Sequence, residues 1–76
     1  MLEDMPEKTM RMFLIFKEAL EAEREAQKTY QQAAALCEDA ALKKVLEGFY
    51  RDEVRHEKAL LQRYNRLRKK YNVQGE

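Results

Sequence analysis

The chain has 76 residues, of which 45% are apolar and 38% are charged, with two glycines and one proline. This composition is typical of long amphipathic helices and argues against a protein built from strands and turns. A chain of this length forms one domain at most and buries too little apolar surface to be comfortably stable alone. The formal net charge of +1 gives no reason to expect a polyelectrolyte partner.

Charge is unevenly distributed along the chain. Residues 1–38 carry 5 basic and 8 acidic side chains, whereas residues 39–76 carry 10 basic and 6 acidic ones. Much of the basic excess lies in RYNRLRKKYN, where cations near the end of a helix favour the negative end of its dipole. We therefore expect no nucleic-acid partner. Binding of nucleic acid by this tail remains an alternative that predicts a strong dependence on salt.

A single cysteine, Cys37, excludes an intramolecular disulfide and any four-cysteine metal site within one chain. No apolar run approaches the length of a membrane span, and MLEDMPEK lacks the basic start and apolar core of a signal peptide. These features predict a soluble cytoplasmic protein with no membrane partner.

The first predicted helix spans residues 5–37. The segment DMPE offers Asp4 as N-cap, with a Glu three residues later and the single proline in the first turn. Apolar side chains then recur at helical spacing, and the positions expected to face the core are Phe13, Phe16, Leu20, Tyr30, Ala34 and Cys37. Glu23 and Gln27 lie on this same stripe, where apolar residues are the rule.

The second predicted helix spans residues 40–71, with Asp39 as its N-cap. Glu53 and His56 fall on its apolar stripe, where spacings of three and four alternate. The other members of that stripe are Leu42, Val45, Leu46, Phe49, Leu60, Tyr64, Leu67 and Tyr71.

A short turn between two helices makes them antiparallel neighbours. If the turn is centred near Glu38, both Glu23 and Glu53 lie roughly 22 Å from it, at 1.5 Å per residue, and face each other. His56 is expected one turn further along. Three side chains able to bind a metal therefore converge from two helices. If the heights differ by a residue or two, Glu25 replaces Glu23 as the candidate.

A single hairpin would leave an apolar face of each helix uncovered, and a second copy is the economical cover. We therefore expect residues 1–76 to form one all-α domain, an antiparallel two-helix hairpin that dimerises into a four-helix bundle. Two copies would bring four carboxylates and two imidazoles to one level.

Four buried carboxylates repel one another and lose hydration, and two divalent cations would remove both penalties. Oxygen ligands with some imidazole suit iron or manganese, although zinc is an acceptable substitute. The sequence therefore predicts two divalent metal ions per dimer, iron or manganese by ligand preference, held by Glu23, Glu53 and His56 of each chain. Tyr30, two turns after Glu23, is expected to lie close to the metal ligands.

Two motifs support a resemblance to a known family. EREAQKTY (residues 23–30) has the form Glu-x-x-Ala-x-x-x-Tyr, and DEVRHEKAL (residues 52–60) contains Glu-x-x-His. Together they resemble the rubrerythrin branch of the ferritin-like di-iron carboxylate proteins, whose bundles use Glu-x-x-His ligands. The chain has one helix pair where full-length members have two, so it looks like the half-length encapsulated ferritin-like proteins.

That resemblance implies that two chains build the di-iron site at their interface, and that dimers assemble into rings. It assigns the ligand roles to Glu23, Glu53 and His56, with Tyr30 nearby. Rubrerythrins carry a further ligand at the position of Ala26, so a simpler symmetric site is implied here. The rubredoxin-type four-cysteine module is missing, and the tail KKYNVQGE shows no cargo-targeting peptide for an encapsulating shell protein.

The function expected from these observations is ferroxidase activity, the oxidation of Fe(II) in iron storage or detoxification. One alternative is a peroxidase or oxidase that takes electrons from a separate donor. Another is a helical-hairpin oligomerisation module without catalysis, in which the polar residues of the stripe only fix register.

Overall fold

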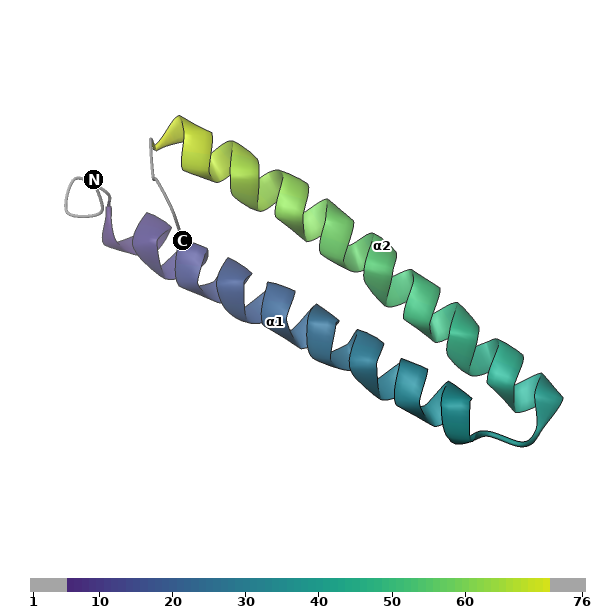
Figure 1. The fold of residues 1–76 in the computed structure, drawn as a ribbon. Coiled ribbons are helices and arrows are strands. Elements are labelled where there is room, and N and C mark those ends of the chain that lie inside the picture. Colours follow the sequence, from purple (N-terminus) through teal and green to yellow (C-terminus); the bar gives the residue numbers. More distant parts are fainter. Residues whose placement is uncertain (1–5, 72–76) are drawn as a thin grey trace.

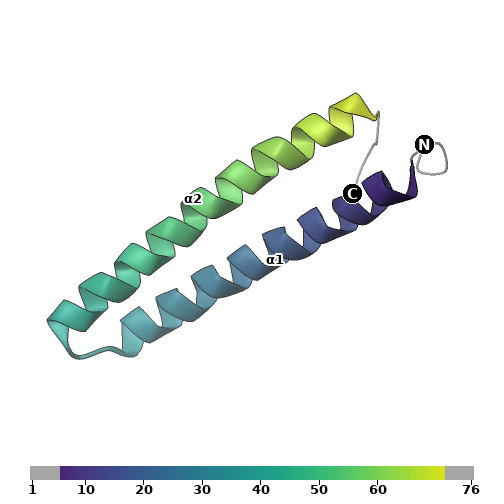
Figure 2. The same cartoon turned by 180° about the vertical axis from the view of Figure 1, so that it is seen from behind.

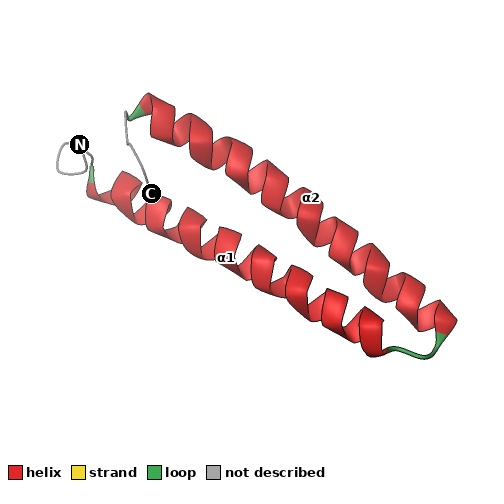
Figure 3. Ribbon diagram, viewed as in Figure 1, coloured by secondary structure: helices red, strands yellow, loops and turns green. Residues whose placement is uncertain are grey.

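The computed structural model describes residues 6–71 as two long helices joined by a short loop (Figure 1). Helix α1 spans Glu7–Leu36 and helix α2 spans Ala40–Lys70. They run antiparallel, side by side in both views, and form a hairpin 53 Å long and 19 by 15 Å across (Figure 2). The described residues contain no strand (Figure 3). The prediction of an all-α helical hairpin is therefore confirmed for this part of the chain.

Helix α1 begins directly after its proline. Pro6 has φ of −56° and ψ of 147°, so it precedes the helix. The sequence analysis had placed it in the first turn of the helix. The carbonyl of Pro6 accepts a hydrogen bond from the Met10 amide at 3.0 Å. No side chain caps this end within the described residues, and the predicted N-cap, Asp4, lies outside them.

The loop and the start of α2 follow from Asp39. Its Oδ1 accepts hydrogen bonds from the amides of Ala41 at 2.9 Å and Leu42 at 3.2 Å, which confirms the predicted N-cap. A cap of this type contributes about 1 kcal/mol to helix stability. Cys37 and Asp39 have extended backbone conformations, and the chain travels outward before α2 begins (Figure 1). This extended segment displaces α2 along the hairpin axis, toward the loop end, relative to α1.

The best-buried part of the hairpin lies toward the end remote from the loop. Phe13, Leu20 and Tyr64 form a cluster there, with Phe13 and Tyr64 in edge-to-face contact at 5.7 Å between ring centroids. Other apolar side chains pack around this cluster: Met10, Phe16, Leu60, Leu67 and Tyr71. Ala34 is buried toward the loop. The last turn of α2 is basic, and its positive charges interact favourably with the negative end of the helix dipole.

One flank of the hairpin, the open face, leaves large apolar side chains in solvent. At 100° per residue, Met12, Phe16 and Tyr30 project from the same flank of α1. Leu42, Val45 and Phe49 project from the matching flank of α2 and are 49%, 48% and 45% exposed. We call these six residues the open face. A single hairpin therefore buries only part of the apolar stripe that its sequence carries.

Both helices contribute to the open face at each end of the hairpin. Tyr30 packs against Phe49 with ring centroids 5.4 Å apart, near the loop. Toward the other end, Met12 and Phe16 of α1 line a groove of about 370 Å³ together with Leu67 of α2. Neither helix has a segment that is apolar enough, over the length required, to cross a membrane.

Candidate metal centre

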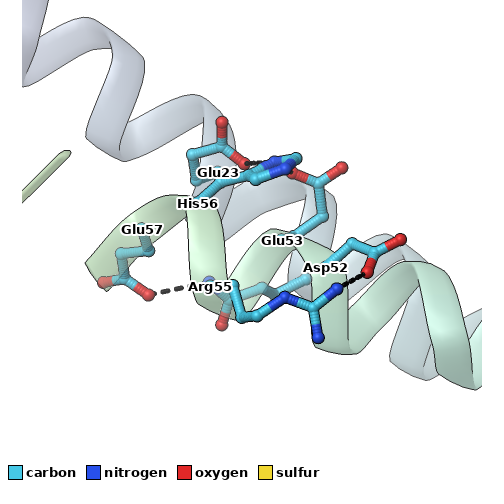
Figure 4. A network of polar contacts seen from close by, with 7 residues as sticks. Glu23, Asp52, Glu53, Arg55, His56 and Glu57 are labelled. Atoms are coloured by element: carbon cyan, nitrogen blue, oxygen red, sulfur yellow. Dashed lines mark hydrogen bonds and ion pairs between the residues drawn. The ribbon is translucent and has the colours of Figure 1, made fainter. Parts of the chain in front are cut away.

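Three potential ligands meet near the middle of the hairpin. Glu23 comes from α1, whereas Glu53 and His56 come from α2, three residues apart and so on one face of that helix. One ligand atom from each side chain lies within 4.8 Å of the other two. Figure 4 shows the three side chains directed toward one another. The structure thus brings together the three residues that the sequence proposed as ligands.

His56 lies between the two carboxylates. Its Nδ1 is 3.2 Å from Oε1 of Glu53 and 3.6 Å from Oε1 of Glu23. The sequence had placed Glu23 level with Glu53 and His56 one turn further along. Because the loop shifts α2 outward, Glu23 faces the interval between Glu53 and His56 and approaches both.

The carboxylates and the imidazole differ in burial. The side chains of Glu23 and Glu53 are 22% and 21% exposed, whereas that of His56 is 58% exposed. His56 projects on the same flank of α2 as Phe49, because seven residues make nearly two full turns. The imidazole therefore stands at the edge of the open face, and the two carboxylates lie deeper between the helices.

The proximity of the carboxyl groups changes their acidity in opposite directions. The pKa of Glu23 is raised by its hydrogen bond with Glu53, by burial and by the negative charge of Glu53, while His56 opposes these effects. The pKa of Glu53 is lowered, first by the hydrogen bond from Glu23 and further by His56. The two carboxyl groups are therefore close enough to affect each other's acidity, and both lie near the imidazole of His56.

The donor set fits a divalent metal ion. Oε1 of Glu23 is buried and has no hydrogen-bond partner, so an acceptor is left unsatisfied where a cation would be favourable. Carboxylate oxygens with one imidazole nitrogen suit iron or manganese, and zinc accepts the same ligands. Glu23, Glu53 and His56 are the residues that would hold such an ion.

Other residues considered from the sequence lie outside this cluster. Tyr30 packs its ring against Phe49 and, within residues 6–71, makes no hydrogen bond to a candidate ligand. Its proximity to a bound metal stays a prediction. Glu25, the alternative to Glu23, is exposed and pairs with Lys28 on its own helix. Cys37 sits in the loop, where its thiol donates to the carbonyl of Asp39.

The sequence analysis overlooked a polar network beside the cluster. Glu57 accepts hydrogen bonds from Arg24 and Gln27, both at 2.7 Å, and so joins α2 to α1. Nearby, Arg55 pairs with Asp52 within α2. No sequence signal singled out Arg24 or Glu57, because each lies beside the apolar stripe among other charged side chains.

Glu57 should make the metal-free fold sensitive to acid. The hydrogen bonds from Gln27 and Arg24 lower its pKa from the ordinary value of 4.5, so it favours folding above that pH. The contribution is lost as pH falls below about 4.5 and through the pKa of the folded state. Glu57→Gln should therefore reduce stability near neutral pH and make the loss on acidification shallower, measured by urea unfolding of metal-free protein.

Glu25→Gln is the matched control, because Glu25 pairs only within its own helix. Equal pH profiles for Glu57→Gln and the unsubstituted chain would contradict a folded-state interaction of the Glu57 carboxylate.

Comparison with known proteins identifies the family of the chain. A model of the ferritin-like domain family matches residues 3–70, which is most of the chain. No significant match was found among curated proteins or among solved structures. The match includes both helices and all three candidate ligands. The chain therefore belongs to the ferritin-like domain family.

Proposed function

We propose that this protein is a ferroxidase, which binds Fe(II) at a site shared by two chains and oxidises it in iron storage or detoxification. The observation that carries the proposal is the convergence of Glu23, Glu53 and His56 within 4.8 Å, with an unsatisfied carboxylate oxygen among them. Membership of a family that typically binds iron supports iron as the metal.

A second copy supplies what one chain lacks. One hairpin offers three ligand side chains, and His56 stands at the edge of a face whose apolar residues are exposed. Two copies packed through their open faces would cover this apolar surface and bring two ligand sets together. Four carboxylates would then balance the charge of two Fe(II) ions. In this proposal the bundle forms by dimerisation.

The proposed roles of the residues follow from their surroundings. Glu23 and Glu53 bind Fe(II) through their carboxylate oxygens and compensate its charge. His56 supplies a nitrogen ligand from the edge of the open face. Fe(II) is the substrate and loses one electron to dioxygen or peroxide. Phe49 and Leu60 would limit access of water once the open face is covered.

The motifs also support a finer assignment. We place the chain with the half-length, rubrerythrin-like members of the family, on the strength of EREAQKTY and DEVRHEKAL. Assembly of dimers into rings, a cytoplasmic location and residence within a protein compartment are parts of this proposal. A storage cavity would then belong to the higher assembly, because 76 residues cannot enclose one.

Removal of one ligand tests the catalytic proposal. Glu53→Ala should lower the rate of Fe(II) oxidation by roughly 100-fold or more, since losing a group that only supports a ligand already costs about 10- to 100-fold. The rate is measured from Fe(III) absorbance after mixing anaerobic protein and Fe(II) with dioxygen. Glu47→Ala, an exposed site on the same helix, is the control and should match the unsubstituted chain.

An unchanged rate in Glu53→Ala would overturn the ferroxidase assignment. The non-catalytic oligomerisation module would then be the better description. In that case Glu23→Leu should leave the oligomer as stable as before or stabilise it, because no metal needs the carboxylate.

A charge placed on the open face tests the shared site. Val45→Asp should convert dimers to monomers, because an unpaired carboxylate would be buried at the interface. Mass is measured by sedimentation equilibrium with Fe(II) present under anaerobic conditions. Leu14→Asp is the matched control, since Leu14 is 57% exposed and projects from the other flank of α1. Dimers that persist in Val45→Asp would exclude the open face as the interface.

A further inference from the structure

Three polar side chains join the helices directly beside the metal centre. Arg24 donates from Nε to Oε2 of Glu57 at 2.7 Å, and Gln27 donates from Nε2 to Oε1 of Glu57 at 2.7 Å. Both oxygens of one α2 carboxylate are therefore held by α1. In Figure 4, Glu57 points away from the cluster of Glu23, Glu53 and His56. We call Arg24, Gln27 and Glu57 the clamp.

The clamp lies at the same level as the ligands. Glu57 directly follows His56 on α2, and Arg24 directly follows Glu23 on α1. Consecutive helical residues differ by 1.5 Å in height and 100° in direction, so ligands and clamp occupy adjoining faces of the same turns. Any sliding or rotation of α2 that breaks the clamp would also change the separation between Glu23 and His56.

The residues that face each other at this level are polar, and the buried apolar residues lie on either side of it. The buried residues Phe13, Leu20 and Tyr64 lie toward the end remote from the loop, and Ala34 lies toward the loop. Between them, among the described residues, the facing positions carry the carboxylates of Glu23 and Glu53 in place of apolar side chains. At this level the clamp supplies hydrogen bonds that join the two helices.

The clamp contributes more to position than to stability. Arg24 is 52% exposed, and an ion pair at such a site adds little to the free energy of unfolding. Two short hydrogen bonds to the two oxygens of Glu57, however, fix both the orientation of its side chain and its position along the axis of α1. The clamp would therefore act on the metal centre through the relative placement of the two helices, to which a metal site is sensitive.

We propose that Glu57, held by Arg24 and Gln27, is a positioning residue that sets the register of α2 against α1 and so the geometry of the metal centre. The inference rests on the proposed function, because it concerns the same site. It adds three residues, none of them a ligand, on which the site depends.

Anaerobic Co(II) binding tests the inference, since the visible spectrum of Co(II) reports ligand geometry and its titration reports affinity. Glu57→Ala should lower the Co(II) affinity by about 10-fold or more and alter the spectrum, while circular dichroism shows retained helix. Glu57→Gln keeps the size of the side chain and should give a smaller change in the same direction. Glu25→Gln is the control and should bind Co(II) like the unsubstituted chain.

A charge exchange separates positioning from a general loss of stability. Arg24→Glu and Glu57→Arg should each weaken Co(II) binding, and the double variant should restore affinity and spectrum toward those of the unsubstituted chain. A double variant that binds as weakly as the single ones would contradict the clamp.

The remaining outcomes distinguish the two proposals. If the unsubstituted chain binds no Co(II), both the proposed function and the clamp are wrong. If it binds Co(II), and both Glu57 variants bind with equal affinity and an identical spectrum, the metal centre stands and the positioning role alone is overturned.

Discussion

Two carboxylates that face each other between two helices impose the main constraint on this molecule. Glu23 and Glu53 lie largely out of solvent, and the pKa of one rises while that of the other falls. One oxygen of Glu23 is also buried without a hydrogen-bond partner. A divalent cation satisfies that oxygen and both charges together, which is why we interpret the cluster as a metal centre.

The same constraint explains why the hairpin looks incomplete. His56 stands at the edge of the open face, and the apolar residues around it are exposed in a single chain. Such a surface usually marks an interaction site in a protein of this size. A two-fold arrangement of two hairpins would hide that surface and double the ligand set in one step. In our account, assembly and metal binding are therefore two aspects of one event.

Much of the fold was predictable from the sequence because helical spacing is a strong signal. The stripe around Phe13, Leu20 and Tyr64 identified the buried side of each helix, and Asp39 marked the start of α2. The start of α1 was less predictable. Pro6 precedes that helix with an extended conformation, and the sequence pattern alone does not separate that position from the first turn.

The candidate site was predictable in composition but not in detail. Glu23, Glu53 and His56 could be brought together because spacing places them on the stripe at similar heights. Their register depended on the extended loop at Cys37 and Asp39, whose path the sequence pattern does not define. The clamp was missed because Glu57 lies beside the stripe, among many charged residues with no periodic signal. Which residues contact each other across the two helices depends on the axial register of the helices. The sequence pattern does not define that register, and the structure does.

The most direct test of a metal site shared by two chains is an anaerobic Fe(II) titration of metal-free protein, with the mass of the oligomer followed at each addition. Our account predicts saturation at one Fe(II) per chain, together with assembly into species that contain an even number of chains. Saturation without assembly, or the absence of stoichiometric binding, would contradict it.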